Sequence, residues 1–144
     1  MHIFTYGTLM FPDVWRSVAG RAFETVAGTA RGFSIFRVQN ALFPGIIAAA
    51  VDDSVRGVVY LDVDDAAVTR LDRFEDDFYV RQTLSIACDD GRELSADAYV
   101  VPVNQRAMLT NEPWTREAFV ESGGLQQFVR RFAGFARLAV EEER

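Results

Sequence analysis

The chain has 144 residues, of which 49% are hydrophobic, enough for one domain with a buried core. Its fifteen basic residues, all arginine, stand against twenty-one acidic ones, and the net charge of −6 argues against nucleic acid or an anionic membrane as a partner. The absence of lysine excludes Schiff-base chemistry on a lysine amine.

The first half of the chain is typical of short strands separated by turns. His2–Tyr6 has strand character and is followed by a turn at Gly7–Met10. Pro12 suits the first position of a short helix, which Gly20 then ends. Four further strands are predicted, at Phe23–Ala30, Phe33–Val38, Ile46–Val51 and Arg56–Val63.

The second half begins with a helix and a hairpin. Asp64 is a suitable N-cap for a helix that runs to about Phe74. Two predicted strands, Tyr79–Cys88 and Glu93–Val103, flank an Asp-Asp-Gly turn and indicate a hairpin.

Beyond Pro113 the apolar residues recur at spacings of three to four, which is typical of helices. We therefore expect an α+β fold in a single domain over residues 1–144. Residues 112–144 are expected to form a helical extension packed on the β-rich core.

A glycine-containing turn, Tyr6-Gly7-Thr8-Leu9, joins the first predicted strand to the first helix. Gly7 lets a ligand approach the backbone closely, and successive N–H groups in such a turn can form a concave anion site. The same geometry occurs in tight turns that bind nothing, so both interpretations stay open at this point.

An acidic segment with interleaved aromatic residues, Leu71–Arg81, is the second candidate. Crowded carboxylates and burial against an aromatic ring both raise a carboxyl pKa toward the range of a general base. Glu75 is favoured because it ends an amphipathic helix, whereas Asp76 and Asp77 fall in the turn. Asp72 either orients a neighbour or stabilises the turn. The alternative is a solvated acidic loop neutralised by nearby arginines.

Tyr99 is the third candidate, since a strand tyrosine either packs in the core or places its hydroxyl in a pocket. Cys88 shares the period-two pattern of a strand, so we interpret it as buried rather than nucleophilic. With one cysteine and one histidine, His2, we expect neither a metal site nor a cofactor. No signal peptide or membrane-length apolar run is visible, and we expect a cytoplasmic protein.

Four stretches of the chain carry a family resemblance when they are taken together and in order. They are Phe4–Leu9, Gly32–Gly45, Arg56–Tyr60 and Leu71–Arg81. In these stretches the chain resembles the γ-glutamylcyclotransferase superfamily, and most nearly its γ-glutamylamine cyclotransferase branch, which includes the plant avirulence-induced proteins. The resemblance implies a small closed mixed β-barrel with flanking helices.

The same resemblance implies roles for the candidate residues. The Tyr6–Leu9 turn corresponds to the part that binds the glutamyl moiety, Glu75 to the catalytic acid/base, and Tyr99 to a tyrosine that faces the same cavity. Asp76 stands where the family often has glycine. Its negative charge beside Glu75 is expected to raise the pKa of that carboxyl further.

The implied reaction is intramolecular aminolysis of a γ-glutamyl amide to 5-oxoproline and a free amine, with Glu75 moving the proton. The expected partner is a small-molecule substrate, bound by a monomer or a weak homodimer. The leaving amine is left open, and the loops Gln39–Leu42 and Gln105–Glu112 are expected to select it.

Two rival interpretations remain from the sequence. One is a non-catalytic small-molecule binding module on the same fold. The other is an interaction domain that uses the aromatic residues of the C-terminal segment, which are Trp114, Phe119, Phe128, Phe132 and Phe135.

Overall fold

The computed structural model describes residues 1–75 and 78–127, and within them eight strands form one sheet. The strands are β1 (Ile3–Thr5), β2 (Thr25–Arg31), β3 (Phe33–Val38), β4 (Pro44–Ala48), β5 (Ser54–Tyr60), β6 (Val80–Cys88), β7 (Glu93–Val100) and β8 (Leu109–Pro113). The helices are α1 (Pro12–Ala19), α2 (Asp65–Glu75) and α3 (Arg116–Glu121), with 3-10 helices η1 (Thr8–Met10) and η3 (Val103–Met108).

The sheet closes on itself into a barrel. Its strand order is β1-β5-β2-β6-β7-β4-β3-β8, and an additional parallel pairing joins β1 to β7 through Ile3 and Asp97. Five strands thus form the closed mixed barrel that the family resemblance implies, while β4, β3 and β8 extend it beyond β7. The β6–β7 hairpin is long and antiparallel, as expected.

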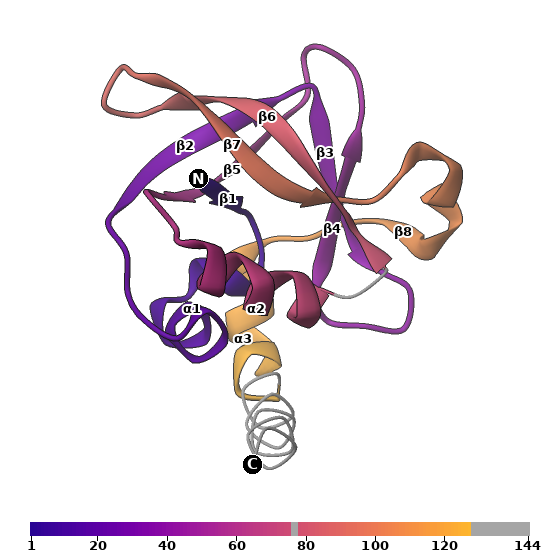
Figure 1. The fold of residues 1–144 in the computed structure, drawn as a ribbon. Coiled ribbons are helices and arrows are strands. Elements are labelled where there is room, and N and C mark those ends of the chain that lie inside the picture. The colour runs from indigo at the N-terminus through magenta and orange to yellow at the C-terminus, as the bar shows by residue number, and fades with distance from the viewer. Residues whose placement is uncertain (76–77, 128–144) are drawn as a thin grey trace.

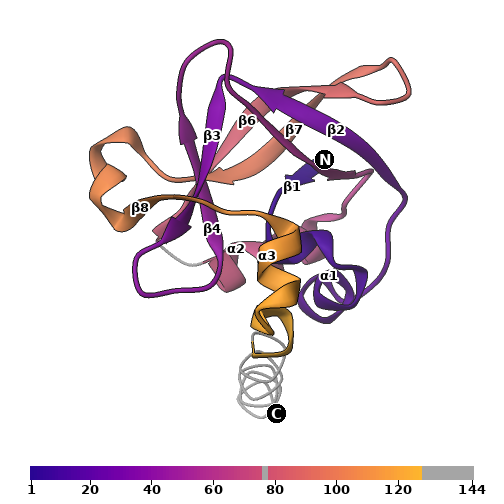
Figure 2. The ribbon, with the colours of Figure 1, turned by 180° about the vertical axis from the view of Figure 1, so that it is seen from behind.

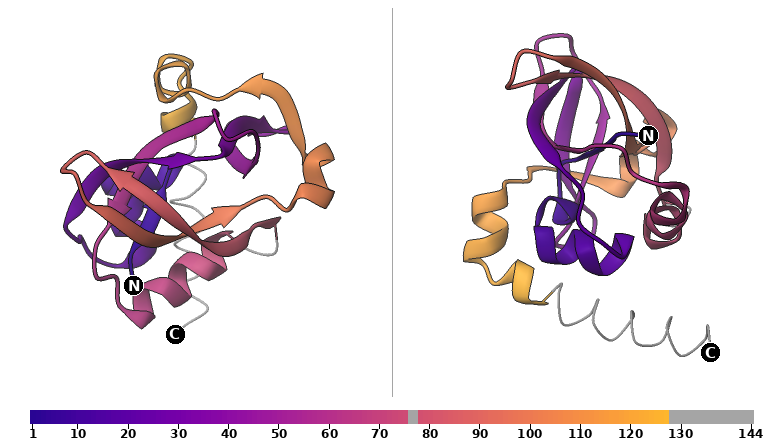
Figure 3. Two further views of the ribbon diagram at one scale, coloured as in Figure 1. Left: turned by 90° about the horizontal axis from the view of Figure 1, so that it is seen from above. Right: turned by 60° about the vertical axis from the view of Figure 1, so that its left-hand side comes forward.

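The helices gather at one end of the barrel (Figure 1). Seen from behind, α3 comes to the front, and the oblique view places α1 between α2 and α3 (Figures 2 and 3). The core at this end includes Trp15 of α1, whose ring stacks on Tyr60 of β5 at 3.6 Å between centroids and an interplanar angle of 3°. A second apolar cluster fills the barrel and includes Phe4, Val59, Ile86 and Ala98.

Local signals in the sequence predict the helix ends correctly. Helix α1 begins at Pro12 and ends at Gly20, whose φ of 95° lies in the left-handed region that glycine tolerates best. Asp64 caps α2, because its Oδ1 accepts a hydrogen bond of 2.8 Å from the N–H of Ala67.

Several predictions about the strands need correction. Strand β5 runs from Ser54 to Tyr60, where the sequence predicted Arg56–Val63. Strand β7 ends at Val100, and Val103 of the predicted Glu93–Val103 belongs to η3.

Strand β4 runs from Pro44 to Ala48, so it begins two residues before the predicted Ile46–Val51 and ends three residues earlier. The segment Gln105–Glu112, expected to be a loop, contains part of η3 and most of β8. Strand β8 is stabilised by pairing with β3, at Val38 and Leu109, and not by strand propensity of its own.

The start of the C-terminal segment packs on the helical end of the barrel. Trp114 and Phe119 are both buried in the cluster that contains Trp15. Phe128, Phe132 and Phe135, the other aromatic residues of the C-terminal segment that the rival interpretation assigned to docking, lie outside the described residues. No helix in the described part of the chain has the length and apolar character needed to cross a bilayer.

Candidate active site

A cavity of about 660 Å³ opens beside the C-terminal end of α2. The described residues that line it come from the barrel strand and turn Phe4–Leu9, the loop Val38–Pro44, the residues Phe74, Glu75, Phe78, Tyr79 and Tyr99, and from Met108 and Gln127. Its volume is in the range of small-molecule binding sites.

All the site residues predicted from the sequence line this one cavity. They are Tyr6, Gly7, Thr8, Leu9, Glu75 and Tyr99. The structure therefore brings together a turn near the N-terminus, the end of a helix and a strand that lie far apart in the chain. The sequence did not single out Pro44, Phe78 or Tyr79 as site residues. The aromatic residues Phe78 and Tyr79 lie within the acidic segment, which was a usable signal, whereas Pro44 is distant from it in the chain.

Glu75 is the last residue of α2, and this helix is held against the core by Ala67, Val68 and Leu71. No described residue donates a hydrogen bond to the Glu75 carboxylate. The described part contains no fully buried side-chain oxygen that lacks a hydrogen-bond partner. The carboxylate oxygens of Glu75 are therefore not fully buried, and they are accessible from the cavity that Glu75 lines. Burial raises the pKa of Glu75 from near 4.5 to about 8. Asp76, expected to raise it further, lies outside the described residues.

The turn after β1 is closed by two of its own hydrogen bonds. The N–H of Met10 donates to the carbonyl of Gly7 at 3.0 Å, and that of Phe11 to the carbonyl of Thr8 at 3.2 Å. The N–H groups of Gly7, Thr8 and Leu9 have no acceptor among the described residues. Consecutive unpaired donors of this kind can bind a small anion.

Three tyrosine hydroxyl groups around Glu75 donate to acceptors within the protein. Tyr6 donates to the carbonyl of Tyr99 at 2.5 Å, Tyr79 to that of Pro44 at 2.7 Å, and Tyr99 to Oδ1 of Asp72 at 2.7 Å. Burial is the main reason why the pKa of each phenol lies above its ordinary value. The three phenols stay neutral, and their rings form part of the cavity wall.

Asp72 belongs to a network that joins α2 to the β6–β7 hairpin. Its Oδ2 pairs with Arg81 at 3.2 Å, and Arg81 also pairs with Asp97 at 3.4 Å. Thr83 donates to Asp97 at 2.7 Å. Arg81, one of the two arginines that the sequence offered to neutralise the acidic segment, thus pairs with Asp72 and Asp97.

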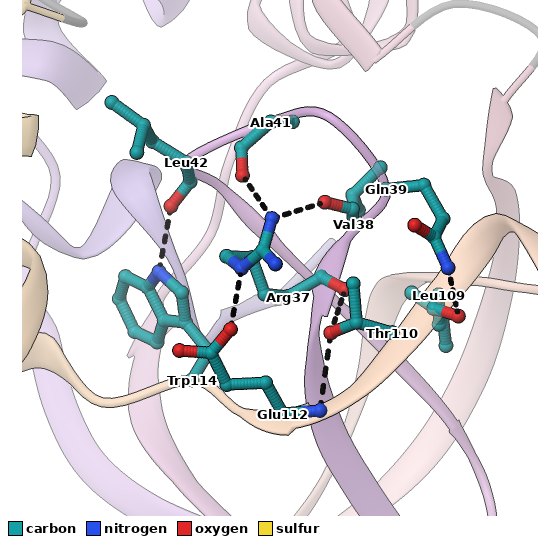
Figure 4. Close-up of polar contacts among 9 residues, drawn as sticks. All are labelled: Arg37, Val38, Gln39, Ala41, Leu42, Leu109, Thr110, Glu112 and Trp114. Carbon is teal, nitrogen blue, oxygen red and sulfur yellow. Dashed lines mark hydrogen bonds and ion pairs between the residues drawn. The ribbon is translucent and has the colours of Figure 1, made fainter.

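The loop after β3 is held in place by side chains outside the cavity (Figure 4). Arg37 donates to the carbonyls of Val38 and Ala41, at 3.4 and 3.2 Å, and its Nε pairs with Glu112 at 2.9 Å. Trp114 donates from Nε1 to the carbonyl of Leu42 at 2.9 Å. The loop therefore presents a fixed wall to the cavity.

The described residues contain no group of three or more His, Cys, Asp or Glu side chains close enough to hold a metal ion. Cys88 is buried, and burial is the main cause that raises its pKa. The chemistry available in the cavity is that of one carboxyl group that titrates near neutral pH, beside backbone donors that suit an anion.

Comparisons with known proteins agree with this architecture. The family model for "Gamma-glutamyl cyclotransferase, AIG2-like" proteins matches residues 3–116. AIG2-like protein D of Arabidopsis thaliana is 34% identical over 103 residues, a match that spans 69% of this chain and 67% of that protein. Against two further AIG2-like proteins of that plant, the match spans 57% of the relative's length.

Solved structures show the same fold. A solution structure of an Arabidopsis thaliana protein superposes with a TM-score of 0.69 at 23% identity, covering 96% of this chain and 82% of the other. A gamma-glutamyl cyclotransferase structure gives a TM-score of 0.62 at 18% identity, covering 69% and 65%. At such low sequence identities, the structural similarity shows only that the fold is shared.

Proposed function

The chain belongs to the gamma-glutamyl cyclotransferase, AIG2-like family, and on this basis we propose that it converts a γ-glutamyl amide into 5-oxoproline and a free amine. The observation that supports the proposal most is the cavity itself. It joins a carboxyl group whose pKa is raised to about 8 with the open N–H groups of the Gly7–Leu9 turn.

The substrate in this proposal is an amide of the glutamate side chain with free α-amino and α-carboxylate groups. The turn's N–H groups bind the α-carboxylate. Ionised Glu75 takes a proton from the α-ammonium group, and the freed amine attacks the γ-carbonyl carbon. A new C–N bond closes the five-membered lactam, and Glu75 gives its proton to the leaving nitrogen as the original amide C–N bond breaks. Glu75 then takes the second proton from the ring nitrogen and passes it to the released amine, which departs as an ammonium ion.

Geometry contributes to the rate in this mechanism. The reacting amine and carbonyl already belong to one molecule, so the role of the site is to hold the substrate in a near-attack conformation. Proton transfer by a carboxyl group of matched pKa adds about 10²–10⁴-fold. The rings of Tyr6, Tyr79 and Tyr99, whose hydroxyl groups are hydrogen-bonded within the protein, form an apolar surface beside the reacting groups.

The raised pKa of Glu75 means that most of this carboxyl group is protonated below pH 8. The reaction needs the complex in which Glu75 is ionised and the substrate is in its α-ammonium form, and this complex has one proton fewer than the complex with protonated Glu75. Productive binding below pH 8 therefore requires the release of one proton, which makes the reaction faster at mildly alkaline pH.

The proposal is tested by incubating the protein with γ-glutamyl hexylamide and following 5-oxoproline and hexylamine separately. We expect the two products to appear in equal amounts with many turnovers per protein molecule. Release of glutamate in place of 5-oxoproline would indicate hydrolysis and contradict the proposal. Binding of the amide with no product would favour the non-catalytic binding module.

A further inference from the structure

We propose that the cavity selects γ-glutamyl amides whose leaving amine is neutral and apolar beyond its nitrogen, namely an alkyl or arylalkyl amine. This inference rests on the proposed function and identifies the class of amine that is released. Diamines, lysine side chains and amino acids carry a second charged group and fit the cavity less well.

One side of the cavity is an apolar wall, which we define as Ala41, Leu42, Phe43, Phe78 and Met108. Three of these, Ala41, Phe43 and Phe78, pack on a single apolar cluster together with Tyr79. The rings of Phe78 and Tyr79 meet edge to face, with their centroids 4.6 Å apart. The apolar wall therefore adjoins the tyrosines that surround Glu75.

Charge is scarce in the lining. Among the described lining residues, Glu75 carries the only charged side chain, and the reaction uses it for proton transfer. A second ammonium or carboxylate on the leaving amine would meet no opposite charge among these residues. Removing such a charge from water without a partner is strongly unfavourable.

The backbone of the apolar wall also has few acceptors to offer. The carbonyls of Val38 and Ala41 accept from Arg37, and that of Leu42 accepts from Trp114. The carbonyl of Phe43 accepts from the N–H of Val38 at 3.0 Å. An ammonium group beside the wall would therefore compete for acceptors already in use, whereas an alkyl group needs none.

Two members of the apolar wall keep part of their surface in contact with solvent. Leu42 is 38% exposed and Met108 is 43% exposed. An apolar leaving group would remove this surface from water, and a charged group would not gain in the same way. Their exposure favours an apolar occupant.

The test uses three γ-glutamyl amides that differ only in the terminal group of one chain: the hexylamide, the 5-aminopentylamide and the 5-carboxypentylamide. We expect kcat/KM for the hexylamide to exceed that of either charged amide by at least about tenfold. Equal or better turnover of a charged amide would overturn the inference and leave the proposed function standing.

Dissociation constants of the three amides on the Glu75→Gln variant separate the two proposals. If the wild-type protein forms 5-oxoproline from none of the three amides but the variant binds the hexylamide most tightly, the proposed reaction is wrong and the cavity's preference holds. If the three amides bind equally, the preference is refuted whatever the turnover.

A charge placed in the apolar wall provides the matched test. Leu42→Glu changes only the side chain, and its carbonyl can still accept from Trp114. We expect this variant to favour the 5-aminopentylamide over the hexylamide, reversing the order. Val51→Glu adds the same charge at a residue that is 88% exposed and not in the lining, and it should keep the original order. An unchanged order in Leu42→Glu would contradict the assignment of the wall.

Discussion

Gly7 lies so close to Pro44 that a Cβ atom at Gly7 would come within 2.8 Å of the proline Cγ. Pro44 in turn accepts the hydroxyl hydrogen bond of Tyr79 through its carbonyl. The contact therefore joins the turn proposed to bind the substrate to the wall of the cavity. This close approach favours glycine at position 7, because any side chain would begin with a Cβ atom in contact with the Pro44 ring.

Replacing Gly7 by alanine should disturb both sides of that contact. We expect Gly7→Ala to lower the free energy of unfolding by roughly 1–3 kcal/mol, measured by urea denaturation. Displacement of the turn should lower kcat/KM by about 100-fold. In the double variant Gly7→Ala/Pro44→Ala the clashing Cγ and Cδ atoms are absent, and part of the lost stability should return. Strict additivity of the two changes would contradict a direct clash.

Stability should depend on pH through Glu75. Its pKa is raised from near 4.5 to about 8 on folding, so the folded state binds more protons than the unfolded state between these values. The wild-type protein therefore loses stability as pH rises through this window, and Glu75→Gln does not share that loss. We expect the free energy of unfolding of Glu75→Gln, relative to wild type, to rise by roughly 2–4 kcal/mol between pH 5 and pH 9. Solvent in the cavity makes this change smaller than the pKa shift alone would give.

Thermal or urea unfolding across this pH range measures the difference. Glu24→Gln, at an exposed position outside the cavity lining, serves as the control for the change in net charge. If Glu75→Gln and Glu24→Gln change the free energy of unfolding by the same amount at every pH, the Glu75 carboxyl is not the group with the raised pKa.

The rate should follow the same titration. For the wild-type protein we expect kcat/KM to rise about tenfold per pH unit below pH 7 and to level near pH 8, where Glu75 ionises. Initial rates of 5-oxoproline release, taken at low substrate concentration, give this profile. A rising limb centred near pH 4.5 would show that the working carboxyl has an ordinary pKa.

The hydroxyl of Tyr99 should matter less than its ring. Since that hydroxyl donates to Asp72, Tyr99→Phe removes one hydrogen bond but keeps the cavity wall. We expect a loss of roughly 1 kcal/mol in unfolding free energy and a kcat/KM within about threefold of wild type. Tyr99→Ala, which also removes the ring, should lower kcat/KM much further. A collapse of activity in Tyr99→Phe would instead mean that the hydroxyl contacts the substrate.

The parts of the fold that depend on residues close together in the sequence could be predicted from the sequence. Gly20 and Asp64 fix helix ends through their own backbone and side-chain geometry. The position of Glu75 at the end of an amphipathic helix followed from the apolar spacing of α2. Closure of the barrel came from the family resemblance, because the pairing of Ile3 with Asp97 has no local signal.

Other parts depend on partners distant in the chain. Strand β8 contains Asn111 and Pro113, which disfavour strands, and it forms because β3 provides a pairing edge. Likewise, strand alternation predicts which face of β7 carries Tyr99 but not that its hydroxyl meets Asp72, 27 residues earlier. The fixed loop after β3 depends on Arg37 and Trp114, whose acceptors only the folded structure defines.

The central claim is that the carboxyl group of Glu75 performs the proton transfer of cyclisation. It is tested most directly by the turnover of γ-glutamyl hexylamide by Glu75→Gln, measured beside Tyr99→Phe at pH 8. We predict that kcat falls by about 10²–10⁴-fold in Glu75→Gln while the dissociation constant of the amide changes little. Glu75→Gln protein that is folded and turns over within about threefold of wild type would contradict the account.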